Sequence, residues 1–224
     1  MTILIATGLR REARLMAGLG VTVIAGGGDA ARLERELEAL AGSASAILSS
    51  GLAGALDPAL EVGNVVIGGV TDVARDERLM GRLARLVQGG KVGTIAGSDN
   101  PLATAVDKRA LFSETGALAV DMESHVAARV AARHGVPFAA LRVISDTADT
   151  TLPPAALAGM RPDGRIAIGA VLAAVIREPS QLPALIRTAR DAEKAFRVLR
   201  GVHDALRGLG VGGLDPGKLA LDMA

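Results

Sequence analysis

The sequence predicts an α/β fold whose sheet is covered by helices on both faces. Short apolar runs alternate with longer amphipathic ones, as strands separated by crossover helices do. The apolar runs lack polar alternation, which is typical of strands buried on both faces. The 224 residues show no internal repeat, no linker and no composition break before about residue 150. We therefore expect one core and a single domain over residues 1–224.

The expected elements follow one another along the chain. Asp29 is a suitable N-cap for the second helix, and Gly135 ends the helix before Pro137 begins the last strand. The expected strands are Thr2–Ala6, Val21–Ala25, Ser45–Ser50, Asn64–Val70, Gly93–Ala96, Ala117–Val120 and Pro137–Ser145. The expected helices are Arg10–Ala17, Asp29–Leu40, Asp76–Val87, Ala103–Phe112, Met122–His134 and Arg165–Ile176.

The C-terminal region has a different pattern. From Gln181 to Leu209 apolar residues recur every three or four positions, and arginines occupy the opposite face. This pattern predicts an amphipathic helical extension over residues 180–211. Its apolar stripe either packs on the domain or a dimer partner, or lies at an anionic membrane surface.

Composition excludes several classes of function. Lys and Arg (25) nearly balance Asp and Glu (24), for a net charge of +1, which argues against a nucleic-acid-binding surface. The chain has no cysteine, so it has no disulfide frame or thiolate metal site. The N-terminus enters a strand pattern without a signal peptide, so we expect a cytoplasmic protein. The apolar run Ile166–Ile176 is too short to span a membrane and predicts a buried helix.

Two carboxylates and an arginine lie at the exits of two apolar strands. Val-Asp-Met-Glu covers residues 120–123, and Arg-Val-Ile-Ser-Asp covers residues 142–146, one helix and one strand later. This ordered pair resembles the purine nucleoside phosphorylase and nucleosidase superfamily, especially its methylthioadenosine/adenosylhomocysteine nucleosidase branch. The resemblance implies a three-layer α/β/α fold with a mixed, mostly parallel sheet, and an enzyme that cleaves an N-glycosidic bond.

Cleavage of a purine riboside requires three functions. Its transition state resembles a ribosyl cation, so the site must protonate the leaving base, hold the ribose hydroxyls and present a nucleophile. The resemblance implies that Asp146 is the general acid at purine N7 and that Ser145 orients it. An Asp at this position also implies adenine, because relatives that act on 6-oxopurines tend to carry Asn. The alternative is that Asp146 caps a turn.

The resemblance implies the remaining roles as well. Glu123, in the first turn of a helix, would bind the ribose hydroxyls, and Met122 would pack against the ribose. Glu12 would activate the attacking water, and Arg142 would hold the nucleophile or its glutamate. The open alternatives are a favourable charge at a helix N-terminus for Glu123, a core role for Met122, an exposed position for Glu12 and a structural ion pair for Arg142.

A glycine-rich segment, residues 49–58, follows the third expected strand and resembles the family's glycine loop. Gly51 and Gly54 would let the backbone approach the base and the nucleophile closely. Phosphorylases tend to carry phosphate-binding Arg and Ser in this loop, where this chain has Ser49 and Leu52. A conventional phosphate cradle is therefore not expected, and both water and phosphate stay open as the nucleophile.

Two further loops bear on the ligand. Arg10 and Arg11 form an alternative oxyanion site, although solvated surface arginines are the more ordinary interpretation. Pro101 and Leu102 lie in the loop that covers adenine in the family; Pro101 stands where nucleosidases carry a stacking Phe, so apolar contact replaces stacking. We expect no metal and no cofactor, with phosphate as an alternative co-substrate, because the three histidines form no ligand cluster.

The whole chain resembles the hopanoid-associated phosphorylases, which are linked to the removal of adenine from adenosylhopane. The segments 7–14 and 119–124 and the tail around residues 179–186 carry this resemblance. It implies a lipid-linked adenine nucleoside as the substrate, peripheral contact with the inner face of the membrane, and a homodimer or higher homo-oligomer. The alternatives are a soluble methylthioadenosine/adenosylhomocysteine nucleosidase and a non-catalytic nucleoside- or lipid-binding module.

Overall fold

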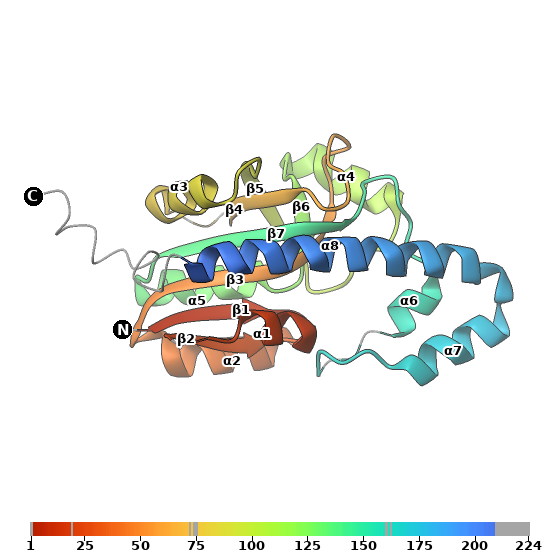
Figure 1. Ribbon diagram of the computed structural model, residues 1–224, viewed down its shortest axis with the longest axis horizontal. Coiled ribbons are helices and arrows are strands. Elements are labelled where there is room, and N and C mark those ends of the chain that lie inside the picture. The colour runs from red at the N-terminus through yellow and green to blue at the C-terminus, as the bar shows by residue number, and fades with distance from the viewer. Residues whose placement is uncertain are drawn as a thin grey trace, which may run out of the picture.

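The protein is a mixed sheet covered by helices on both faces (Figure 1), so the predicted α/β fold with a mostly parallel sheet is confirmed. In order along the chain, the strands of the computed structural model are β1 Thr2–Thr7, β2 Val21–Ala25, β3 Ala44–Ala55, β4 Val65–Val70, β5 Lys91–Gly97, β6 Ala119–Asp121 and β7 Phe138–Asp146. The structure describes residues 2–18, 20–71, 73, 76–159, 161 and 163–208, and the side chains among them up to residue 206.

The sheet order is β2-β1-β3-β6-β5-β4-β7, and β3 also pairs with β7. The pairs β1–β2, β1–β3, β3–β7, β4–β5 and β5–β6 are parallel, whereas β3–β6 and β4–β7 are antiparallel. Strands β3, β6, β5, β4 and β7 therefore pair in a closed circuit. The length of β3 permits this closure, because residues 47–54 pair with β7 and residues 54–55 pair with β6.

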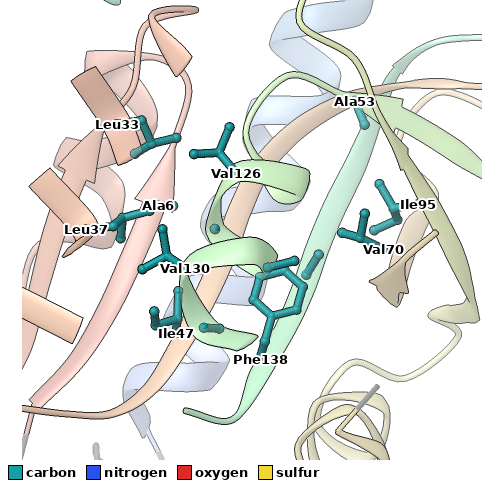
Figure 2. Packing of buried hydrophobic residues seen from close by; sticks show 14 of the residues in the cluster. Ala6, Leu33, Leu37, Ile47, Ala53, Val70, Ile95, Val126, Val130 and Phe138 are labelled. Atoms are coloured by element: carbon teal, nitrogen blue, oxygen red, sulfur yellow. The ribbon is translucent and has the colours of Figure 1, made fainter. Parts of the chain in front are cut away.

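Helices cover the two faces of the sheet with separate apolar clusters. On one face α2 (Ala30–Ala41) and α5 (Ser124–His134) pack through Leu33, Leu37, Val126 and Val130 against strand residues such as Ile47 (Figure 2). The other face is covered by α1 (Arg10–Met16), α3 (Glu77–Leu86) and α8 (Leu182–Gly208). The remaining helices are α4 (Ala105–Thr115), α6 (Pro154–Ala158), α7 (Ile168–Arg177) and the 3₁₀ turn η1 (Pro179–Gln181).

Side-chain caps set the beginnings of several helices. Asp29 Oδ1 accepts a hydrogen bond from the Arg32 N–H at 2.9 Å, as its predicted N-cap role requires. Gly135 ends α5 in the left-handed conformation, with φ of 63°, which few other residues adopt easily. The predicted boundaries of these elements were therefore close to the observed ones.

The glycine-rich segment 49–58 is not the loop that was expected. Strand β3 continues through it to Ala55, and Gly51 and Gly54 are paired residues of that strand, opposite Arg142 and Asp146 of β7. Ser49 and Ser50 are buried. The strand ends only after its pairing partner has changed from β7 to β6. The glycines therefore act inside a strand, where missing side chains leave space above the sheet.

The apolar helix α7 is exposed, contrary to the predicted buried helix. None of its residues is buried, and Ile168, Leu172 and Ile176 are 68%, 57% and 79% exposed. In Figure 1, α7 lies apart from the sheet, at the far end of α8. No helix in the described part of the chain has both the length and the apolar character of a membrane span.

The C-terminal extension forms α8 and divides into two parts. Its second half packs on the sheet, with Ala195, Phe196 and Leu199 nearly inaccessible to solvent. Its first half keeps Leu182 and Ile186 about half exposed, at 45% and 44%. Packing on the domain is therefore correct for the second half. The last predicted positions, 209–211, lie outside the described residues.

Candidate active site

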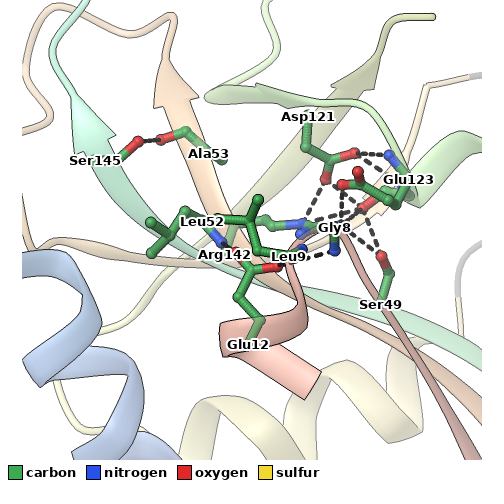
Figure 3. A network of polar contacts seen from close by, with 11 residues as sticks. Gly8, Leu9, Glu12, Ser49, Leu52, Ala53, Asp121, Glu123, Arg142 and Ser145 are labelled. Atoms are coloured by element: carbon green, nitrogen blue, oxygen red, sulfur yellow. Dashed lines mark hydrogen bonds and ion pairs between the residues drawn. The ribbon is translucent and has the colours of Figure 1, made fainter. Parts of the chain in front are cut away.

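One buried cation organises the first part of the site. Arg142, in the middle of β7, is fully buried, and its Nε lies 2.5 Å from Asp121 Oδ2 (Figure 3). Its Nη2 donates to Ser49 Oγ at 2.6 Å and lies 3.7 Å from Glu123 Oε2. Two of the predicted site residues, Arg142 and Glu123, thus lie together as part of a larger network.

Asp121 is the residue that joins this network to helix α5. Its Oδ1 accepts the backbone N–H groups of Glu123 and Ser124 at 3.0 and 2.7 Å. Its Oδ2 contacts both Arg142 and the Ser124 hydroxyl. A carboxylate that caps a helix and pairs with a buried arginine stabilises both. Sequence reasoning missed Asp121, Ser49 and Ser124 as partners of Arg142.

Glu12 is buried rather than exposed. Its Oε2 accepts the N–H groups of Gly8 and Leu9 at 2.9 and 2.7 Å, and its Oε1 accepts the N–H of Leu52 at 2.9 Å. Burial raises the pKa of the Glu12 carboxyl, against the opposing effects of these backbone hydrogen bonds and of the Arg142 charge. The surface alternative for Glu12 is therefore wrong, because the residue is 2% exposed and its carboxyl group is bonded to the β1–α1 turn and to β3.

Gly51 brings Glu12 and Arg142 to one point. A Cβ at residue 51 would lie 2.7 Å from Arg142 Nη1 and 2.8 Å from Glu12 Oε1. Arg142 Nη1 is buried, and it has no hydrogen-bond partner among the described residues. A buried guanidinium N–H next to a carboxylate oxygen is suited to bind a small polar molecule that donates to one and accepts from the other.

Glu123 lies beside the same cluster, at the N-terminal end of α5. A Cβ at Gly8 would be 2.8 Å from its Oε1, so the β1–α1 turn passes very close to the carboxyl group. Burial raises the pKa of Glu123 to about 8; the Arg142 charge opposes this rise, whereas Asp121 and Glu12 reinforce it. Met122 is half-buried, and its Cε would lie 3.4 Å from a Cβ at Gly28.

Asp146 forms a second centre at the end of β7. Ser145 Oγ donates to Asp146 Oδ1 at 2.8 Å, which is the contact expected of an orienting neighbour. Asp146 Oδ2 forms an ion pair with the fully buried Lys108 of α4. A Cβ at Gly54 would lie 3.0 Å from Asp146 Oδ2, so Gly54 leaves room for this pair. Sequence reasoning missed Lys108, because one lysine in a mostly exposed helix gives no signal.

Strand β7 links the two centres. Arg142 and Asp146 are four residues apart, a span of about 13 Å at about 3.3 Å per residue. The first centre gathers Glu12, Glu123 and Arg142, and the second holds Asp146 and Ser145. An elongated ligand along this strand would meet different chemistry at its two ends.

The two predicted ligand loops show mixed results. Leu102 packs on a small apolar cluster that includes Leu56 and Val120, whereas Pro101 is exposed. Arg10 Nε donates to the backbone oxygen of Asp163 at 3.0 Å. Arg11 is 2.7 Å from Glu193 of α8, and its guanidinium stacks 4.0 Å from the Phe196 ring centre. These contacts favour the surface interpretation of both arginines over an oxyanion site.

A metal centre would need a cluster of ligands. Among the residues that the structure describes, no group of three or more His, Asp or Glu side chains is arranged to hold a metal ion. His125 is paired with Asp99 at 3.0 Å, and His134 is paired with Glu38 at 2.5 Å. Neither of these two hydrogen bonds involves Arg142.

Comparison with known proteins agrees with this geometry. The model of the phosphorylase superfamily matches residues 72–177, which include β6, α5 and β7. No curated protein sequence matches the chain significantly. The predicted resemblance to this superfamily is confirmed, and the match supports an enzyme that cleaves a glycosidic bond.

Solved structures extend the likeness to almost the whole chain. A methylthioadenosine/adenosylhomocysteine nucleosidase of Helicobacter pylori, a mutant with 5′-methylthioadenosine in its active site, is 18% identical with a TM-score of 0.60, over 91% of this chain and 98% of that chain. The Streptococcus pneumoniae nucleosidase with a transition-state inhibitor is 19% identical with a TM-score of 0.60, over 92% and 100%. A futalosine hydrolase mutant of H. pylori is 22% identical with a TM-score of 0.54, over 65% and 90%. The fold is that of the nucleosidases.

Proposed function

We propose that this chain is an enzyme that cleaves the N-ribosidic bond of an adenine nucleoside. The observation that carries the proposal is the division of buried polar groups along β7. Glu12, Glu123 and Arg142 gather at one centre, and Asp146 stands at the other. Nucleoside cleavage needs a nucleophile and ribose ligands at one end of the substrate and a proton donor at the other.

The contacts of each group support a distinct role for it. Asp146 gives a proton to purine N7 as the bond from N9 to the anomeric carbon breaks, and Ser145 orients the Asp146 carboxyl group. Glu123 binds the ribose hydroxyls. Glu12 takes a proton from the attacking water, for which a carboxyl pKa raised by burial is suitable. Arg142 holds Glu12 and the nucleophile through its unpartnered Nη1.

We propose water rather than phosphate as the nucleophile. Arg142 faces three carboxyl groups, those of Glu12, Asp121 and Glu123, and its charge is already compensated by Asp121 at 2.5 Å. A phosphate dianion at this place would meet carboxyl groups without a free cation, which is unfavourable in a buried site. Water meets no such penalty.

The finer proposal is that the nucleoside is lipid-linked, with adenosylhopane as the substrate. The exposed apolar face of α7, formed by Ile168, Leu172 and Ile176, supports contact with a lipid surface. Arg165 and Arg177 flank this helix, but Arg165 lies 3.9 Å from Asp163 and Glu178 follows Arg177, so the support comes from the apolar face and not from the charge of the ends. Each CH₂ group of such a substrate that is buried contributes about 0.8 kcal/mol.

A nucleosidase for methylthioadenosine or adenosylhomocysteine is the second candidate, and the fold comparisons favour it. The deciding experiment incubates the protein with adenosylhopane, methylthioadenosine and adenosine, each with and without phosphate. We expect adenine to be released both with and without phosphate. Mass analysis should show a sugar product with a hydroxyl group, and not a phosphate, at the anomeric carbon. A ribosyl 1-phosphate product formed only with phosphate would overturn the choice of water. Release only from methylthioadenosine would favour the second candidate, and no release from any substrate would indicate a non-catalytic module.

The membrane contact needs a test that leaves the core intact. Truncation after Ser180 would remove Phe196 and Leu199 from the core, so substitution is the better choice. We expect Ile168→Ser, Leu172→Ser and Ile176→Ser together to weaken binding to anionic vesicles and to slow cleavage of adenosylhopane, with adenosine cleavage unchanged.

The matched control for this triple variant changes two exposed valines elsewhere, Val92→Ser and Val106→Ser, which are 56% and 72% exposed in the parent protein. The control should bind vesicles as the parent does. Equal vesicle binding by the triple variant, or a change from dimer to monomer without any change in vesicle binding, would contradict membrane contact through α7.

A further inference from the structure

Lys108 is buried in a helix whose other residues are exposed or half-buried. Helix α4 contributes only Lys108 to the buried set, and this side chain is fully inaccessible. A lysine in such a place needs strong partners, because desolvation of an ammonium group is costly. Its Nζ donates to Asp146 Oδ2 and to the backbone oxygens of Thr147 and Thr150, at 3.0 and 2.9 Å for the two backbone oxygens.

These three contacts define what Lys108 can do. An ammonium group has three N–H donors, and each has an acceptor within the protein. No donor is left for a substrate atom, so Lys108 acts through Asp146. Because Ser145 already donates to Oδ1, both oxygens of the Asp146 carboxyl group are held by the protein.

We propose that Lys108 is a positioning residue that holds Asp146 for catalysis and stores the proton that Asp146 delivers. This inference rests on the proposed function. Asp146 and Lys108 meet as a buried ion pair. A carboxylate by itself has no proton for the departing base, and the buried ammonium supplies one at hydrogen-bond contact.

The bond between N9 and the anomeric carbon breaks, and its electron pair goes to the base. N7 takes a proton from Asp146, and Asp146 takes one from the Lys108 ammonium, which becomes a neutral amine. The attacking water adds its oxygen to the anomeric carbon and loses a proton to Glu12. Glu12 then releases its proton to solvent, and the neutral Lys108 amine takes up a proton. Both groups thus return to their starting states.

A purely structural role is the competing explanation. Lys108 also ties α4 to the turn at residues 147–150, and its loss would loosen that turn whatever the chemistry. The two explanations differ in their dependence on the leaving group. Adenine needs protonation to depart, whereas p-nitrophenolate departs without it. Only proton delivery therefore predicts a loss that is confined to the nucleoside.

The experiment compares Lys108→Met with the parent on adenosine and on p-nitrophenyl β-D-riboside. We expect kcat for adenosine to fall about 10²–10³-fold with KM nearly unchanged, and kcat for the p-nitrophenyl riboside to fall less than about threefold. Asp146→Asn should show the same pattern. The double variant should lose no more than the worse single variant, because residues that act as a unit are not additive.

Equal losses on the two substrates would overturn the proposal and assign Lys108 a structural role. If Lys108→Met does not fold, as judged by circular dichroism, Lys108→Arg decides the question. Arginine keeps the cation but gives up protons far less readily, so it should restore folding and retain the selective loss on adenosine. Lys108→Arg with full adenosine activity would contradict proton storage. A parent protein that cleaves neither substrate would overturn the proposed function, and this inference with it.

Discussion

The two polar centres on β7 differ in their balance of charge. Around Arg142, one cation faces the carboxyl groups of Glu12, Asp121 and Glu123. Around Asp146, one carboxyl group faces one cation, Lys108. The buried surplus of acid raises the proton affinity of Glu12 and Glu123, whereas Asp146 and Lys108 balance each other one to one. The first arrangement suits a centre that receives a proton and binds hydroxyls, and the second suits a centre that delivers a proton.

The imbalance also predicts where the fold is most vulnerable. Arg142 compensates several buried charges at once, so its removal affects all of them. Lys108 compensates only Asp146. Breaking the Arg142 centre should therefore lower the free energy of unfolding more than breaking the Asp146 centre does. Breaking the Asp146 centre should lower kcat more, relative to the stability that is lost.

The largest expected effect is on stability. Arg142→Met leaves Asp121 buried without its ion-pair partner and should lower the free energy of unfolding by about 3–5 kcal/mol, as measured by urea denaturation. Arg142→Met combined with Asp121→Asn should recover part of this loss, because the stranded charge is removed. A loss below about 1 kcal/mol for Arg142→Met would show that water already compensates these carboxyl groups.

The second effect is on turnover. Asp146→Asn should lower kcat for adenine release about 10²–10⁴-fold, because an amide cannot deliver the proton that the base needs. Substrate binding should change much less, so KM is the internal control. Steady-state kinetics on correctly folded protein decides the matter. A nearly unchanged kcat would remove Asp146 from the acid role and reduce the second centre to a structural ion pair.

The third effect separates the pH responses of the two centres. Because the folded pKa of Glu123 is raised to about 8 from 4.5, the folded state binds more protons than the unfolded state between these values. The contribution of Glu123 therefore falls as pH rises through this window, and Glu123→Gln should remove the fall. We expect Glu123→Gln to melt higher than the parent at pH 8 and nearly equally at pH 4.5.

The same variant tests ribose binding. Glu123→Gln should weaken recognition of the ribose hydroxyls, so a 2′-deoxy substrate should lose less activity in the variant than in the parent. Equal losses in both proteins would assign Glu123 a structural role. A melting temperature that depends on pH in the same way for both proteins would contradict the raised pKa.

The sequence predicted the fold well because its signals are local. Asp29 caps its helix and Gly135 ends another, and each is determined by its own segment. Glu12, Glu123 and Arg142 were assigned to one site by the family resemblance, and the structure brings the three side chains together. Glu12 lies in the first turn of α1, Glu123 at the N-terminus of α5, and Arg142 in the middle of β7.

The missed features depend on contacts between distant segments. Lys108 meets Asp146 only because folding brings α4 to the end of β7, and the sequence of α4 alone resembles a surface helix. Strand β3 continues through its glycines because β6 and β7 offer pairing partners on either side. The apolar sequence of α7 predicted burial, but helix periodicity does not say whether a covering surface belongs to the same chain.

The smallest expected effect tests which neighbour holds Asp146. Ser145→Ala removes one hydrogen bond to Asp146 Oδ1, while Lys108 keeps Oδ2 in place. A single hydrogen bond contributes about 0.5–1.5 kcal/mol, so kcat for adenine release should fall only about two- to tenfold. The matched control is Ser43→Ala, an exposed serine whose hydroxyl bonds only the nearby Leu40 oxygen at 3.0 Å, and it should leave kcat unchanged. A loss near that of Lys108→Met would mean that Ser145 positions Asp146 as strongly as the lysine does. The second centre would then depend on a chain of hydrogen bonds and not on one balanced ion pair.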